Sequence, residues 1–86
     1  MQAAAMGREE ILRLMDGMIE RQRRKLLDIA RETIPGATEE DIRNPQDFPA
    51  LIGNARFHFE DGILAGYLGM RMALIHELNR REEKTE

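Results

Sequence analysis

Residues 62–75 read GILAGYLGMRMALI, and Arg71 is the only charged residue among them. In a helical conformation, apolar side chains surround this segment on nearly every side. A helix of this kind must be buried on nearly every side, and one neighbouring helix from a chain of 86 residues cannot cover it. We therefore expect the segment to lie at the centre of an oligomer, packed on its own chain and on a symmetry-related copy.

Small residues recur at helical spacing in the same segment, namely Gly62, Gly66, Gly69 and Ala73. Their separations of 4, 3 and 4 positions place them on one helical face. Three glycines inside a helix cost about 3 kcal/mol in helix propensity. The dispersion contacts of a closely approaching helix are the term that offsets this cost. The predicted oligomer interface consists of Ala55, Phe59, Gly62, Gly66, Gly69, Met70 and Ala73.

An apolar seam with alternating separations of 3 and 4 runs through the first third of the chain. Its members are Leu12, Met15, Ile19, Gln22, Leu26, Ile29 and Thr33. This spacing is typical of a helix that faces a partner helix over several turns, and it predicts a first helix over 8–34. Further apolar residues beside the seam, among them Ile11, Leu14 and Met18, indicate more than one neighbour. The lone polar Gln22 is interpreted as a residue that sets the alignment of the helices.

Residues 35–48 form the predicted connector, because the three prolines of the chain fall at 35, 45 and 49. Thr38 followed by three acidic residues predicts a short helical turn over 38–43. Ile42 and Phe48 should fold inward and cover the end of the bundle. An acidic cap and an early proline predict a second helix over 49–81. We expect a frayed N-terminus over 1–7 and a polar tail over 82–86.

The predicted fold is therefore all-α: one domain over 1–86, built as an antiparallel two-helix hairpin that dimerises into a four-helix bundle. A tetramer is the main competing assembly. A chain this short buries only about 60% of its unfolded surface, and it has no cysteine that would supply a disulfide. Without a disulfide, oligomerisation and a bound metal are the remaining sources of added stability, and oligomerisation is the favoured one.

Location and chemistry are less constrained by the sequence. The absence of cysteine suits a reducing compartment, no export signal is evident at the N-terminus, and the apolar run over 63–75 is too short to cross a bilayer. We expect a cytoplasmic protein. There is no serine, no cysteine and no glycine-rich phosphate loop, so no catalytic residue and no cofactor is predicted, and a non-enzymatic role is favoured.

A metal or small-anion site is the first alternative, using Arg56, His58 and Asp61. His58 and Asp61 lie three positions apart and can share a helical face, but the Glu-x-x-His pairs of bundle metal sites are missing. Otherwise Glu60 and Asp61 are solvated or pair with basic residues of the first helix. Embedded arginines need carboxylate partners. For Arg56 and Arg71 the candidates are Asp16, Glu20 and Asp28 of the first helix, or Glu60 and Asp61 of a second copy.

Nucleic-acid binding is the second alternative, through the basic belt Arg21, Arg23, Arg24 and Lys25. Consecutive residues spread over all faces of a helix, no aromatic residues are interleaved with them, and the net charge of −3 opposes binding to nucleic acid. The leading prediction is a self-associating helical bundle that serves as a protein-interaction or regulatory module. Its expected partner is itself, and an unidentified second protein is a further candidate; no membrane partner is expected.

Overall fold

The computed structural model describes residues 6–84, and every regular element within that range is helical. The elements are α1 (Arg8–Thr33), α2 (Glu39–Arg43), the 3₁₀ turn η1 (Pro45–Asp47), α3 (Pro49–Ile52) and α4 (Ala55–Lys84). The all-α prediction is confirmed for this part of the chain. The predictions for residues 1–5 and 85–86 lie outside the described residues.

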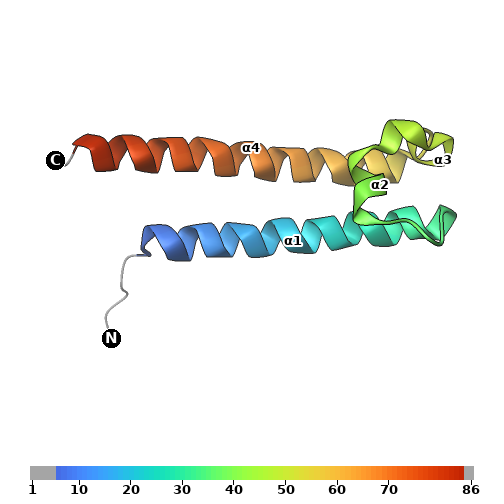
Figure 1. Ribbon diagram of the computed structural model, residues 1–86, viewed down its shortest axis with the longest axis horizontal. Helices are drawn as coiled ribbons and strands as arrows, with labels where there is room; N and C mark the ends of the chain where they lie inside the picture. Colours follow the sequence, from blue (N-terminus) through green and yellow to red (C-terminus); the bar gives the residue numbers. More distant parts are fainter. Residues whose placement is uncertain (1–5, 85–86) are drawn as a thin grey trace.

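The two long helices, α1 and α4, lie side by side and run in opposite directions, joined at one end by the short elements (Figure 1). We call this end the closed end and the opposite end the open end. The molecule measures 51 × 31 × 19 Å. Because a helix with its side chains is about 10–12 Å across, the molecule is a flat, elongated hairpin.

The first helix begins at Arg8 as predicted and ends at Thr33, one residue before the predicted end. Ile34 leaves the helical region with φ −128° and ψ 87°, because the ring of the following Pro35 disfavours helical geometry there. Its amide still donates a last hydrogen bond to the carbonyl of Ala30, at 2.8 Å. The chain then turns back across the end of the hairpin.

The connector covers the closed end. The hydroxyl of Thr38 accepts a hydrogen bond from the amide of Asp41 at 3.3 Å, while the Asp41 carboxylate accepts one from the amide of Thr38 at 2.9 Å. This reciprocal cap starts α2 and directs Ile42 into the core, where it is buried. Phe48 packs against the same core. The predicted inward positions of Ile42 and Phe48 are confirmed.

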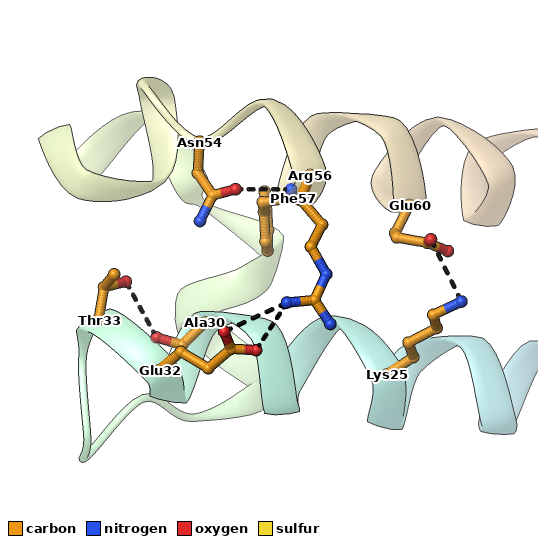
Figure 2. Close-up of polar contacts among 8 residues, drawn as sticks. All are labelled: Lys25, Ala30, Glu32, Thr33, Asn54, Arg56, Phe57 and Glu60. Atoms are coloured by element: carbon orange, nitrogen blue, oxygen red, sulfur yellow. Dashed lines mark hydrogen bonds and ion pairs between the residues drawn. The ribbon is translucent and has the colours of Figure 1, made fainter.

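The second helix differs from the prediction of one helix over 49–81. α3 ends at Ile52, and α4 begins at Ala55 after a break at Gly53 and Asn54. The side-chain oxygen of Asn54 accepts a hydrogen bond from the amide of Phe57 at 2.9 Å (Figure 2), so asparagine caps a new helix start. The new start leaves the Phe57 side chain fully buried. At the other end α4 continues through residues 82–84, which were predicted to belong to the polar tail.

The buried core lies in the closed half of the hairpin. Its apolar members are Ile19, Leu26, Ile29, Ala30, Ala37, Ile42, Leu51, Phe57 and Leu64. The described residues of the open half, 8–18 in α1 and 65–83 in α4, contribute no member of this core. That half is joined by polar contacts, such as the hydrogen bond of 2.7 Å from Arg8 to the Asn79 side chain. Within residues 6–84, no helix is both long enough and apolar enough to cross a bilayer.

Replacing the cap tests the break before α4. Asn54→Ala removes the acceptor for the Phe57 amide and should lower the free energy of unfolding by about 1 kcal/mol. Asn54→Asp keeps an acceptor at the same position and should stay close to the wild type. Urea unfolding followed by circular dichroism measures both. Equal stability of the alanine variant and the wild type would show that the cap does not fix this helix start.

Candidate association surface

An apolar hollow lies between α1 and α4 on one side of the hairpin. Its volume is about 340 Å³, and its wall is almost entirely apolar. The lining residues are Met15, Met18 and Ile19 of α1 and Tyr67, Met70 and Leu74 of α4. Half of them are methionines, whose flexible and polarisable side chains adapt to the shape of a partner. The hollow is therefore an opening in the apolar packing of the two long helices.

Large apolar side chains are exposed on the two long helices. Phe59 is 68% exposed, Met70 is 67% exposed, and more than half of Leu14 faces solvent. Single exposed apolar residues are normal on a protein surface, whereas a contiguous group marks an interaction site. Met70 is both exposed and part of the apolar wall of the hollow, so this side of the hairpin is the candidate association surface.

The glycine face of α4 points away from α1. Gly62, Gly66 and Gly69 are exposed, and a Cβ atom built on any of them has no heavy atom within 4 Å outside its own helix and chain neighbours. Among residues 6–84, then, no other helix approaches these three glycines closely. All seven residues of the predicted interface, Ala55, Phe59, Gly62, Gly66, Gly69, Met70 and Ala73, are exposed. Their role in an oligomer stays a prediction.

Sequence reasoning did not identify the hollow itself. Met15, Met18 and Leu74 were assigned to seams or apolar faces and not to a site. The available signal was the width of the apolar stripe on the first helix, where Leu14 and Met18 lie beside the seam and indicate a second neighbour. Which side of the stripe remains open depends on how α4 lies against α1, and only the structure shows that.

A buried polar contact joins the two helices at the middle of the seam. The side-chain amide of Gln22 donates to the Glu60 backbone carbonyl at 2.8 Å and to its carboxylate at 2.9 Å. Lys25 reaches the other carboxylate oxygen at 3.2 Å (Figure 2). The hydrogen bond from Gln22, followed by that from Lys25 and the positive charge of Lys25, lowers the pKa of Glu60, against the opposing effect of burial. The predicted pairing of Glu60 with a basic residue of the first helix is confirmed.

Arg71 is satisfied by one of its predicted partners. Its Nε donates to one carboxylate oxygen of Asp16 at 2.6 Å, and its Nη2 donates to the other at 3.3 Å. This two-pronged pairing is the geometry that arginine and carboxylate groups favour. It ties the open half of α4 to α1 and, together with the contact at Glu60, fixes the alignment of the helices.

The structure does not bring Arg56, His58 and Asp61 together. Arg56 pairs with Glu32 at 3.0 Å, a partner that was not predicted (Figure 2). The Nε2 of His58 lies 2.6 Å from the carbonyl of Ile52, and Asp61 lines a different hollow beside α2. No cluster of three His, Asp or Glu side chains suited to a metal ion occurs among residues 6–84. The metal or anion site stays a prediction without a shared cavity.

The basic belt is divided between different surroundings. Arg23 lines the hollow beside α2, whereas Arg21 and Lys25 lie on the opposite side, next to Tyr67. Lys25 already binds Glu60, and Arg24 is exposed. The four cations do not form one groove, in agreement with the spread expected for consecutive helical residues. Nucleic-acid binding through the belt stays a prediction.

No protein-family model matches this chain, and no curated protein and no solved structure shows significant similarity to it. The case for its function therefore depends on the surfaces and contacts described above.

Replacing Gln22 tests the buried polar contact. Gln22→Leu extends the apolar seam but leaves the Glu60 carboxylate without its amide donor. The loss of one donor to a buried carboxylate oxygen costs more than the added apolar contact gains, so the urea midpoint should fall even though Lys25 still pairs with the other oxygen. The double variant Gln22→Leu with Glu60→Leu also removes the carboxylate, so it should recover most of the lost urea midpoint. A single Gln22→Leu variant more stable than the wild type would contradict this account.

Acid should destabilise the hairpin through Glu60. Because its contacts lower the pKa of Glu60 below 4.5 in the folded state, the unfolded state binds a proton more readily. The stabilisation is complete above about pH 5 and is lost as the pH falls through the folded pKa. Urea midpoints should therefore fall as the pH is lowered below about 5, and less steeply for Glu60→Gln. Superimposable profiles would contradict the assignment.

Glu77 offers a comparison for the acid profile. Hydrogen bonds from Arg80 and Arg81 lower its pKa to about 2. Its stabilisation is therefore lost from about pH 4.5 down to about pH 2, by the same sign argument. Glu77→Gln should reduce the fall of the urea midpoint in the most acidic part of the pH range. Glu60→Gln should instead reduce the fall that comes from the contact between α1 and α4.

Proposed function

We propose that this chain is a self-association module, in which two hairpins pack against each other through the candidate association surface and form a four-helix bundle. Bringing copies of the chain together is then its role as a protein-interaction or regulatory element. The observation that supports this proposal is the incomplete apolar packing in the open half of the hairpin. There, apolar residues of both helices line a hollow, and none of the apolar side chains described at 8–18 and 65–83 belongs to the buried core.

The dimensions of the hairpin support the same proposal. Its radius of gyration is 17.0 Å, whereas a compact domain of this length has about 12 Å. The chain exposes 6369 Å², about 1,200 Å² more than a compact monomer of its mass. A specific protein interface removes about 800 Å² from each partner. The excess surface of one hairpin is thus large enough to supply its share of a dimer interface.

A second copy also suits the chemistry of the surface. In an interface between identical chains, the same patch serves both partners, so it must be complementary to itself. An apolar patch meets this condition, whereas a patch of one charge does not. The two ion pairs that join the helices in the open half, Arg8 with Glu82 and Arg71 with Asp16, are satisfied within the chain. They leave the apolar side chains as the surface available to a partner.

Sedimentation equilibrium at micromolar concentrations tests the association. The wild type should sediment as a dimer, and its thermal midpoint should rise with concentration because association stabilises the folded state. A well-folded wild type that remains a monomer throughout this range would overturn the proposal.

A pair of leucine variants tests the part played by Gly66. A Cβ atom built on Gly66 has no heavy atom within 4 Å beyond its chain neighbours and the backbone of its own helix, so the Gly66→Leu hairpin should fold at least as well as the wild type, with higher helix propensity. A bulky residue there should hold two copies apart and shift sedimentation toward the monomer. Ala65→Leu adds the same side chain at a neighbouring exposed position, pointing about 100° away, and should remain dimeric. Dimerisation of Gly66→Leu equal to that of the wild type would exclude close packing at this glycine.

A further inference from the structure

Phe59 projects from α4 on the same side as the apolar hollow. It lies eleven positions before Met70, which lines that hollow. Eleven residues make just over three helical turns, so the two side chains leave the helix in nearly the same direction, about 16 Å apart along its axis. One surface therefore carries both an exposed aromatic ring and, further along, an unfilled apolar hollow.

Phe59 cannot reach the hollow of its own chain. The neighbouring Glu60 contacts Gln22 and Lys25 of α1, so Phe59 lies at the level of these residues. The hollow lies further toward the open end, at the level of Met15 and Met18. The ring and the hollow are displaced from each other along the long axis of the hairpin.

We infer that Phe59 of each copy fills the apolar hollow of the other copy, with the two α4 helices antiparallel across a two-fold axis. This inference rests on the proposed self-association and specifies its geometry. A two-fold axis perpendicular to the helices, midway between Phe59 and Met70, exchanges the ring of one copy with the hollow of the other, so both insertions occur together. The axis passes near Leu64 and Ala65, and the two connectors lie at opposite ends of the assembly.

The spacing of residues along α4 fits this contact. Phe59, Ile63, Gly66, Met70 and Ala73 are separated by 4, 3, 4 and 3 positions. This is a heptad seam, on a different side of α4 from the residues that face α1. Gly66 lies close to the axis, where the absence of a side chain allows the two helices their closest approach. The hollow of about 340 Å³ has room for an aromatic ring, and its methionines can adjust around it.

The alternative two-fold axis, parallel to the long helices, does not use these features. It would keep each residue at its own level and place both connectors at the same end. Phe59 would then meet the partner near Gln22 or Lys25, and both hollows would stay empty. The two arrangements differ in a distance that can be measured.

A spin label at one position distinguishes the two arrangements. The chain contains no cysteine, so His76→Cys, at an exposed position of α4, creates a single labelling site. In the antiparallel arrangement residue 76 lies between 11 and 12 residues from the axis, and the two labels should be about 35 Å apart. With both connectors at the same end, they would be about 15 Å apart. The short distance in a dimeric protein would overturn the inference and leave self-association standing.

Truncation of the ring tests its insertion into the hollow. Phe59→Ala should raise the dimer dissociation constant at least about 30-fold, because central aromatic residues dominate interface energies and each dimer loses two. Met72→Ala removes an even more exposed side chain from another side of α4 and should change the constant less than about 3-fold. Phe59 is exposed in the hairpin, so its removal leaves the chain folded, as circular dichroism checks. An unchanged constant for Phe59→Ala overturns the insertion, whereas a monomeric wild type overturns the proposed function itself.

Discussion

The packing of α4 against α1 is the contact on which the rest of the structure depends, and it covers only one side of α4. Phe57, Leu64 and the Glu60 carboxylate face α1 and are buried. Apolar side chains continue around the rest of α4, and toward the open end no other helix among residues 6–84 packs against them. The hydrophobic effect favours removal of this surface from water in proportion to its area. A hairpin with two long helices therefore leaves a large part of its apolar surface uncovered.

The two ends of the hairpin differ in how far their apolar surface is covered. At the closed end the connector supplies Ala37, Ile42 and Leu51, which complete a core around Phe57. The cap at Thr38 starts α2, and the cap at Asn54, two residues after the end of α3, starts α4, so the connector contains no long loop. At the open end no further element of the described chain is available, and the apolar hollow remains. The asymmetry arises because a single connector can cover only the end at which it turns.

Polar contacts determine how the two helices are aligned. Arg56, Arg71 and Arg8 each reach an acidic residue across the hairpin, at three different levels. Exposed ion pairs contribute only about 0–1 kcal/mol each, so these pairs add little stability. The contact between Gln22 and Glu60 differs because it is buried. A shift of the helices past one another would leave this carboxylate without its donor, so it selects one register among several that apolar packing allows.

Residue spacing alone determined the type and number of the long helices, because periodic apolar side chains and proline positions act locally. The seam from Leu12 to Thr33, the stop at Pro35 and the cap at Thr38 are examples. The helix start at Asn54 was not predicted, because an asparagine inside an otherwise helical pattern does not by itself indicate a break. The break is favoured by the burial of Phe57, which depends on tertiary packing. The hollow between Met18 and Met70 was decided by the tertiary structure, since these residues are 52 positions apart and become neighbours only when the helices pack. Local periodicity indicates that α4 has more apolar faces than one neighbouring helix can cover. Which of these faces stays exposed depends on how α1 packs against α4, which is a long-range contact.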